Sequence, residues 1–523
     1  MTVTVTAALA GPATARYSNV YGALVDLGVL SGLGAQDVTG SGDPTAPILN
    51  ASQFYAPLTS SLILTRGAGN PTYTRGTNAW EFDNEGKLIL VPSGAARFGG
   101  ARMVRNLLAA TGTLSTQDVT TIAASYTLSF YGTGSVTLSG TATGTLNGTG
   151  ASTRVQTTVT ATAGTLTLTV SGSVTDAQLE NVTGQADQTA SEYVSVGVLS
   201  APYHGAGVDG VKWFETNKNG SAISEANLLG NHVEGARTNS LLYSRDLTDA
   251  AWVKTNVTAV KTATGIDNAA NSASTLTASA ADATILQTLS LAAAARSFSA
   301  YVKRRTGSGS VYITRDGGTN WKDITSSLGA SWTRVKIENT AVLNPSVGFK
   351  IATSGDAIDV DVCQDEAGAF INSQIITTTA AVTRNADVVT FQFASNWSNT
   401  AGWALATVQG ESWENAKGTA IGNANNGLKL SASNSGIVAY DGTNTVNGPS
   451  GSPSGAEKLA MTWGSGALQV ASGGVAGSAG SYDGAWGLGA IGIGTSQGNV
   501  YIKDVYIGQS AITAAQLQQV TAP

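Results

Sequence analysis

The stretch Glu234-Gly-Ala-Arg-Thr-Asn-Ser-Leu-Leu-Tyr-Ser-Arg-Asp-Leu-Thr-Asp-Ala-Ala-Trp252 opens a run of segments rich in threonine and serine. Two further stretches close the run, namely Gln364-Asp-Glu-Ala-Gly-Ala-Phe370 and Val382-Thr-Arg-Asn-Ala-Asp387. Period-2 alternation dominates the chain, and short alternating segments punctuated by glycine are typical of strands in a sandwich. The two motifs therefore bracket a predicted β-sandwich.

These motifs resemble the opening and the close of the carbohydrate-binding-like jelly-roll module that is common in structural proteins of tailed bacteriophages. Within the run, Phe298-Ser-Ala-Tyr-Val-Lys303 and Trp332-Thr-Arg-Val-Lys-Ile337 are similar to central strands of that module. The resemblance implies a virion protein and not an enzyme. It also implies that the arginine of the opening motif pins the incoming ribbon to the closing strand, so we expect Arg237 near Glu366, with Asn239 beside it in the motif.

A weaker copy of the same frame lies upstream. Arg102-Met-Val-Arg-Asn-Leu-Leu108 stands where the opening motif stands, and Gln178-Leu-Glu180 stands where the close stands. Internal repeats of this kind indicate stacked copies of one building block. We expect two sandwiches of the same topology, with Arg102 and Arg237 at equivalent places and Glu180 matching Glu366.

The last part of the chain follows another pattern. Trp403-Ala-Leu-Ala-Thr-Val408, Lys458-Leu-Ala-Met-Thr-Trp463, Gly498-Asn-Val-Tyr-Ile-Lys-Asp-Val-Tyr-Ile507 and Ile512-Thr-Ala-Ala-Gln-Leu517 resemble the laminin-G/concanavalin-like sandwich. The chain of 523 residues is predicted to be all-β, with tandem antiparallel β-sandwiches (jelly rolls) after an N-terminal docking segment. The expected parts are a docking segment (1–60), a first sandwich (61–198), a connector (199–229), a second sandwich (230–390) and a laminin-G/concanavalin-like sandwich (391–523).

Composition narrows the classes of function. Only 12% of the residues are charged and the net charge is −6, whereas binding of phosphate backbones needs clustered lysine and arginine. A single cysteine, Cys363, excludes an internal disulfide framework. The first ten residues lack a basic region, so we predict no signal peptide, and no apolar run approaches the length of a membrane span. Nucleic-acid binding and membrane insertion are therefore not expected.

Candidate catalytic groups are few. His204 lies near Asp209 in the sequence but no nucleophile elbow accompanies it, and Cys363 falls within a predicted strand. The densest acidic group comprises Asp356, Asp359, Asp361, Asp365 and Glu366. Strand alternation puts Asp359 and Asp361 on one face, where paired carboxylates could cut a glycan, yet this is the closing strand that the family uses for packing. We expect no catalytic residue, no cofactor and no zinc site.

Glycan binding is the better candidate activity. Aromatic faces stack on the C–H faces of sugars, and the last sandwich holds half of the ten tryptophans of the chain. We therefore select four residues as candidate glycan contacts: Trp397, Trp413, Trp463 and Trp486. Calcium remains an alternative at the rim of this sandwich, through Asp441, Asn444 and Asp483, although their spacing is not diagnostic.

The functional expectation is a structural component of a tailed-phage virion, a tail or head fibre or an appendage, that contacts host-surface polysaccharide. Its partners would be other virion proteins and copies of itself, because a low-charge surface rich in Ala, Gly and Thr packs closely, and a trimer is favoured. Two alternatives stay open: a polysaccharide-degrading tailspike, and a secreted bacterial adhesin or carbohydrate-binding protein.

Overall fold

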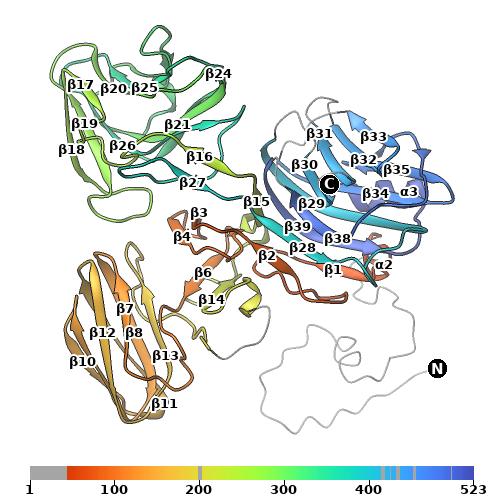
Figure 1. Ribbon diagram of the computed structural model, residues 1–523, viewed down its shortest axis with the longest axis horizontal. Helices are drawn as coiled ribbons and strands as arrows, with labels where there is room; N and C mark the ends of the chain where they lie inside the picture. The colour runs from red at the N-terminus through yellow and green to blue at the C-terminus, as the bar shows by residue number, and fades with distance from the viewer. Residues whose placement is uncertain are drawn as a thin grey trace. The chain divides into compact units, whose positions relative to one another are not determined.

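The computed structural model describes residues 44–197, 203–413, 418–423, 426–431, 436–450, 455–495 and 498–523 (Figure 1). The predicted all-β class is confirmed, since antiparallel strands make up most of the regular structure. The chain divides into two compact units, residues 1–52 and 53–523. In the first, the described residues form one short helix, α2 (Ala46–Asn50). Most of the docking segment predicted for residues 1–60 lies outside the described residues.

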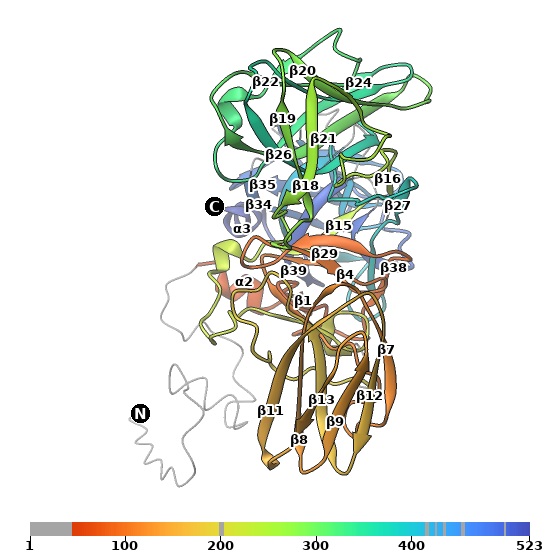
Figure 2. The same cartoon turned by 90° about the vertical axis from the view of Figure 1, so that its left-hand side faces the viewer.

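The first sandwich consists of two sheets (Figure 2). One has the order β10 (Gly144–Asn147), β9 (Ser135–Gly140), β12 (Gly164–Ser171) and β7 (Gln117–Thr121). The other has the order β11 (Gly150–Ala161), β8 (Ala124–Gly132) and β13 (Val174–Asn181). Leu128 and Phe130 of β8 meet Leu138, Leu166 and Leu168 in one buried cluster. Apolar residues spaced two apart therefore supply the core, as the sequence alternation predicts.

The second sandwich has the same plan with more strands. One sheet runs β17 (Val253–Thr255), β20 (Ala283–Thr288), β25 (Ser346–Ile351), β22 (Val311–Thr314), β23 (Lys322–Asp323). The other runs β18 (Val257–Ala263), β19 (Ala273–Ala278), β26 (Ala357–Ala367), β21 (Ala295–Thr306), β24 (Thr333–Ala341). The strand orders of the two sandwiches can be compared sheet by sheet. The sheet β10-β9-β12-β7 corresponds to β23-β22-β25-β20, and the sheet β11-β8-β13 corresponds to β24-β21-β26. The predicted common topology is confirmed, and β17, β18 and β19 are additions of the second copy.

The two copies share an irregularity in the closing strand. In the first sandwich the register of β13 against β8 shifts between Thr175 and Gln178, and Asp176 has a φ of 49°. In the second, β26 shifts against β21 at the corresponding place, and Val362 has a φ of 42°. Both are β-bulges, which place an extra residue on one strand and re-aim the neighbouring carbonyl groups. A β-branched residue with positive φ is costly, so surrounding contacts must hold it there.

The third sandwich recruits strands from far upstream. Its larger, nine-stranded sheet orders β36 (Val475–Ala476), β35 (Ala467–Ser472), β34 (Gly455–Gly464), β29 (Ala401–Trp413), β39 (Gly498–Gly508), β15 (Gly230–Glu234) and β5 (Phe98–Gly99), with β1 (Phe54–Ala56) on β39 and β37 (Gly480–Ser481) on β35. The second sheet orders β2 (Thr72–Thr74), β28 (Val388–Gln392), β38 (Ala490–Thr495), β30 (Gly418–Gly422), β31 (Gly427–Ser431), β32 (Gly436–Tyr440) and β33 (Thr445–Ser450).

This recruitment corrects the predicted boundaries. Strands β1, β2 and β5 fall within or before the range predicted for the first sandwich, yet their buried side chains share one core with residues after 388. Phe54, Phe98 and Trp213 belong to that core together with Ile491 and Ile502. The first sandwich is thus confined to strands β7 to β13, and both jelly rolls are insertions into a larger C-terminal sandwich. Deleting residues 391–523 would uncover this core, so such a deletion cannot isolate the role of the third sandwich.

Three two-stranded ribbons complete the strands: β3 (Ala79–Phe82) with β4 (Leu88–Val91), β6 (Arg102–Arg105) with β14 (Val211–Phe214), and β16 (Arg237–Asn239) with β27 (Val382–Arg384). Turns η1 (Tyr203–Gly205), η2 (Glu225–Asn227) and η3 (Thr325–Ser327) are short. Helix α3 (Ala514–Thr521) begins at a capping box in which Thr513 and Gln516 exchange hydrogen bonds. None of the helices in the described ranges has the length and apolar character of a membrane span.

Candidate functional site

The residues that repeat between the two jelly rolls form a buried hydrogen-bonded clasp in each. In the second, the Asn239 side-chain amide donates to the carbonyl oxygens of Cys363 (3.0 Å) and Ile375 (2.8 Å). Its oxygen accepts from the N–H groups of Leu241 and Asp365, both at 3.1 Å. Cys363 directly follows the bulged Val362, so the amide binds a carbonyl of the bulge. All four hydrogen bonds open to an asparagine side chain are made.

The first jelly roll repeats this clasp atom for atom. Asn106 donates to the carbonyl oxygens of Ala177 and Val194, both at 2.8 Å, and accepts from the N–H groups of Leu108 and Leu179, both at 3.2 Å. Ala177 follows the bulged Asp176 as Cys363 follows Val362. Asn106 therefore matches Asn239, and the bulge that re-aims the carbonyl is part of the same device.

A glutamine and a glutamate of the closing strand extend the clasp. Gln364 accepts from the N–H of Ile375 (2.7 Å) and donates to Glu366 (2.8 Å). Gln178 likewise accepts from the N–H of Val194 (2.8 Å) and donates to Glu180 (3.1 Å). The two glutamates then accept from backbone N–H groups, Glu366 from Asn372 and Glu180 from Ser191. The Gln-x-Glu motif thus ties the chain that leaves each sandwich back onto its last strand.

This correspondence confirms one arginine prediction and overturns another. Arg237 lies 3.9 Å from Glu366 (Nε to Oε2) and over the ring of Phe370, as expected for an arginine that pins the ribbon to the closing strand. Because Asn106 matches Asn239, the position equivalent to Arg237 is Val104, not Arg102. Arg102 instead pairs with Glu192 (2.6 Å) and lies over the ring of Phe214. Aligning the two motifs on their arginines therefore gives a register that is wrong by two residues.

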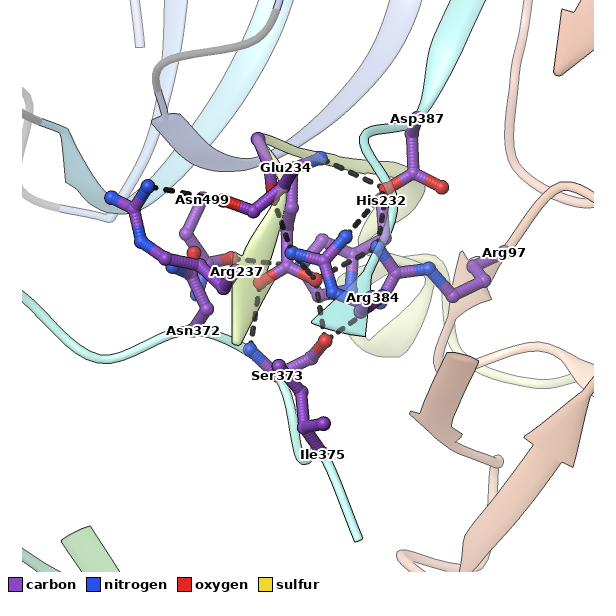
Figure 3. A network of polar contacts seen from close by, with 12 residues as sticks. Arg97, His232, Glu234, Arg237, Asn372, Ser373, Ile375, Arg384, Asp387 and Asn499 are labelled. Atoms are coloured by element: carbon purple, nitrogen blue, oxygen red, sulfur yellow. Dashed lines mark hydrogen bonds and ion pairs between the residues drawn. The ribbon is translucent and has the colours of Figure 1, made fainter. Parts of the chain in front are cut away.

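A second buried polar cluster lies where the inserted sandwiches join the C-terminal one, and we call it the hub (Figure 3). Its charged members come from three parts of the chain and have side chains exposed by 4% or less. They are Arg75, Glu81, Arg97, His232, Glu234, Arg384 and Asp387. Arg75, Glu81 and Arg97 precede the first jelly roll, His232 and Glu234 lie on β15, and Arg384 and Asp387 follow the second jelly roll.

Asp387 and Glu234 are the acceptors at the centre of the hub. Asp387 receives Arg97 at 2.5 Å, Arg75 at 3.0 Å and Arg384 at 3.4 Å, and it also accepts the hydroxyl of Tyr73. Glu234 receives Arg97 at 2.8 Å and Arg384 at 3.5 Å. Fully buried charges are tolerated only when paired and hydrogen-bonded, and here each carboxylate has several donors.

His232 links the hub to strand β39. One ring nitrogen meets Glu81 at 2.5 Å, and the other meets the amide oxygen of Asn499 at 2.7 Å. The ring stacks on Tyr501, with centroids 4.1 Å apart. Burial disfavours the charged imidazolium, but the charges of Glu81 and Glu234 outweigh burial and raise the pKa of His232. The histidine therefore acts as a fourth cation that balances three carboxylates alongside the arginines.

Two carboxylates of the hub, Asp387 and Glu234, have lowered pKa values. Burial alone would raise the pKa of Asp387, but the charges of Arg97, Arg75 and Arg384 lower it to about 2. Burial opposes the ionised form of Glu234 too, and the charges of Arg384, His232 and Arg97 hold its pKa well below its usual range. These groups stay ionised and mutually engaged near neutral pH. The arrangement of Asp387 and Glu234 suits a fixed joint.

Sequence reasoning did not identify the hub. Glu234 begins the opening motif of the second sandwich and Asp387 ends its closing motif, but no pattern in the sequence relates Glu81, Arg97 and His232 to them. The signal was weak, because its members are spread over more than 300 positions and no local spacing relates them. Apolar neighbours around isolated charges, as in Val233-Glu234 or Ala96-Arg97-Phe98, were the available hint that these charges are buried.

The glycan-contact prediction fails for three of the four tryptophans. Trp397, Trp463 and Trp486 are 5%, 1% and 0% exposed, and they pack against one another in the core. Trp397 stacks on Trp463 with centroids 4.7 Å apart, and Trp486 meets both edge-on. Rings buried this deeply have no face for a sugar. Trp413 lies at the end of β29, and its side chain is outside the described residues.

The acidic group of the closing strand is engaged by cations. Asp361 binds Arg245 through both oxygens, at 2.7 and 2.9 Å, and Asp359 accepts from Arg305 at 3.0 Å and Thr275 at 2.7 Å. Asp365 is fully buried between Arg296 (2.6 Å) and Arg315 (3.0 Å). Such contacts hold the carboxylates in place and occupy the oxygens that an acid–base pair would need.

Two further candidates occupy structural positions. The Nε2 atom of His204 lies 3.1 Å from the hydroxyl and 3.0 Å from the carbonyl oxygen of Ser195, while Asp209 accepts from the N–H groups of Gly197 and Gly210. Asp209 therefore does not orient the imidazole in the manner of a catalytic triad. Cys363 is fully buried, and burial raises the pKa of its thiol well above the usual range.

The calcium alternative rests on residues that do come together. Asp441 accepts from the N–H groups of Thr443 (2.9 Å) and Asn444 (2.6 Å) through one oxygen, and from Asp483 N–H (3.1 Å) through the other. Oxygens that face N–H donors close a turn and do not form a calcium cage. Within the described ranges, no three His, Cys, Asp or Glu side chains are grouped as metal ligands.

Comparison with known proteins adds little. No family model matches the chain, and no curated protein matches it. Among solved structures, a sialidase of Trypanosoma rangeli in complex with the inhibitor DANA shares 10% sequence identity over 42% of this chain, with a TM-score of 0.22. The match spans 32% of that sialidase chain. A similarity of this size supports no argument about fold or activity.

The clasp predicts a large and position-specific loss of stability. Asn239→Leu should lower the free energy of unfolding by about 3 kcal/mol or more, because it strands two buried carbonyl oxygens and two N–H groups. Asn106→Leu should have a similar effect in the first jelly roll. The control is Asn181→Leu, at an exposed position at the end of β13. Urea denaturation measures the effect, and a clasp variant as stable as the control would contradict it.

The hub predicts a stability optimum on the acidic side of neutrality. The pKa of His232 is raised above 6.5, so its contribution is complete below pH 6.5 and is lost as pH rises through the folded pKa. The pKa of Asp387 is lowered from 3.8 to about 2, so its contribution is present above pH 3.8 and is lost as pH falls towards 2. Their combined contribution should therefore be greatest between pH 3.8 and 6.5.

Calorimetry across pH 3–9 tests this. His232→Gln should lower Tm by about 2–4 °C at pH 5.5 and by less at pH 9, since the stabilising charge of the wild-type histidine is lost as pH rises through its folded pKa. An equal loss at both pH values would show that the charge of His232 does not contribute.

Proposed function

We propose that the chain is a structural component of a tailed-phage virion, a tail or head fibre or an appendage, that contacts host-surface glycans without catalysis. The observation that carries this proposal is the clasp. Asn239, Gln364 and Glu366 belong to the motifs that resemble the phage carbohydrate-binding-like module, and they make the contacts that close the jelly roll. The motif resemblance therefore rests on residues with a definite structural task.

The architecture supports a display role. Two jelly rolls are inserted into a third sandwich, and a buried network of ion pairs joins the chain segments that flank these insertions. A protein of a particle exposed to changing surroundings benefits from a joint whose charges are shielded from salt by burial. Assembly in the host cytoplasm, exposure on the released particle, and association as a homo-oligomer, with a trimer favoured, remain parts of the proposal.

The state of the carboxylates favours binding over cutting. In the tailspike alternative, one carboxyl group must donate a proton to the glycosidic oxygen, and a second must act as general base on water or as nucleophile. Asp359, Asp361 and Asp365 instead bind arginine side chains. The adhesin alternative shares the binding activity and differs in location, so location decides between the two.

Labelling of particles tests the location. Gold-labelled antibody against the purified chain should decorate tailed particles from a productive infection at defined sites, and averaged density at those sites should have threefold symmetry. The same antibody should not label the surface of uninfected host cells. Label on uninfected cells and none on particles would favour the adhesin alternative.

Incubation with polysaccharide tests the absence of cutting. The purified protein should release no reducing ends from host capsule or lipopolysaccharide over hours, whereas it should co-sediment with the polymer. Release that Asp359→Ala or Asp361→Ala abolishes would establish the tailspike alternative. Asp118→Ala, at an exposed carboxylate of the first jelly roll, is the matched control.

A further inference from the structure

One cavity of the second jelly roll is lined by basic and hydroxyl side chains. Its volume is about 200 Å³, and it lies where the β16–β27 ribbon meets the ends of β21 and β26. Seven residues line it: Ala236, Arg237, Thr238, Ser240, Arg296, Ala367 and Thr383. Ligand sites for whole small molecules usually measure about 300–1,000 Å³, so this cavity has room for one ring or one terminal group of a larger ligand.

The side chains at this cavity offer hydrogen-bond donors. Arg296 is only 7% exposed, and its Nε and Nη2 atoms bond Asp365 (2.6 Å) and the hydroxyl of Ser240 (2.7 Å). Its Nη1 group donates to no protein atom in the described part of the chain, which leaves two N–H donors beside the cavity. Ser240 accepts from Arg296 and keeps its own O–H for a ligand. Thr238 and Thr383 share one hydrogen bond (2.8 Å), so one of their two protons also remains.

The guanidinium groups near the cavity also favour a negatively charged ligand. Arg296 and Arg315 share the single carboxylate of Asp365, and Arg237 lies beside Glu366. At the cavity, the two guanidinium groups of Arg296 and Arg315 thus meet one carboxylate. A guanidinium binds a planar carboxylate through two parallel N–H donors, a geometry that a neutral sugar cannot reproduce.

The first jelly roll shows that the fold does not require these residues. Its clasp and bulge are the same, yet Tyr126 stands in the place of Arg296, as their partners Asn181 and Ala367 on the closing strands show. Counting from the matched asparagines and glutamines, Val104 replaces Arg237, Leu107 replaces Ser240 and Leu179 replaces Asp365. The polar set is therefore specific to the second copy, where a buried aspartate holds Arg296 at the cavity.

We propose that this cavity binds the carboxylate of an acidic sugar, a uronic acid unit of a polysaccharide, with Arg296 taking the carboxylate and Ser240 and the Thr238–Thr383 pair taking ring oxygens. This inference rests on the proposed glycan-binding function and names the class of glycan. It also places the contact on the second jelly roll, away from the buried tryptophans of the third sandwich.

Binding of monosaccharides to the full chain tests the proposal. Saturation-transfer NMR and titration with methyl glucuronide should show millimolar binding, and methyl glucoside should bind at least tenfold more weakly. Arg296→Lys keeps the charge but loses the planar fork, so it should weaken glucuronide binding about tenfold. Thr383→Val, an isosteric change at an exposed position of the cavity, should weaken it about threefold and serves if the buried arginine variant does not fold.

The control is Arg305→Gln, which removes a half-exposed guanidinium of the same jelly roll outside the cavity and should leave binding unchanged. Equal binding of glucuronide and glucoside would overturn the proposal, as would full binding by both cavity variants. Inorganic phosphate that competes as well as glucuronide would reduce the cavity to a simple anion site and also overturn it. Polysaccharide co-sedimentation that survives the cavity variants would leave the proposed function standing and reject this site alone.

Discussion

The ion pair between Arg97 and Asp387, at 2.5 Å and fully buried, is the contact on which the arrangement of unit 53–523 depends. Removing two charges from water is costly, and only close pairing with further hydrogen bonds offsets that cost. Here Arg97 precedes the first jelly roll and Asp387 follows the second. The pair can form only if the chain returns to the same place after both insertions, and any misplacement leaves a buried charge without a partner. The hub thereby specifies one arrangement of distant segments.

The clasp also fixes one local arrangement, because its buried polar groups need specific partners. One asparagine satisfies the bulged strand and the departing loop together, with two donors and two acceptors. Because both jelly rolls keep it, each closes by the same contacts, and the surfaces around it are free to diverge. The first copy fills the corresponding region with Tyr126, Leu107 and Leu179, while the second places Arg296, Ser240 and Asp365 there. A common closure with variable surroundings is a means of giving two copies of one module different surfaces.

Motif-scale features could be read from the sequence, and features that depend on distant contacts could not. The period-2 alternation along the chain and the Gln-x-Glu closing motifs led to the correct class and to the shared topology. The boundaries failed because β1, β2, β5 and β15 have two to five residues each, too few to show which sheet they join. The tryptophan prediction failed because counting rings does not separate a core cluster from a binding face. The predicted equivalence of Arg102 and Arg237 was wrong because the residue that corresponds to Arg237 is Val104, two positions further along the chain.

Insertion of both jelly rolls into the C-terminal sandwich requires that β15, which lies between them in sequence, is an integral strand of that sandwich. Its residues Asn231 to Glu234 pair with Asn499 to Ile502 of β39, and His232 joins the hub. Hydrogen-exchange mass spectrometry of the full chain measures this directly. The amides of β15 should exchange with the same free energy of opening as those of β39, because both would open only when the shared sheet opens. Rapid exchange in β15 beside full protection in β39 would contradict the account.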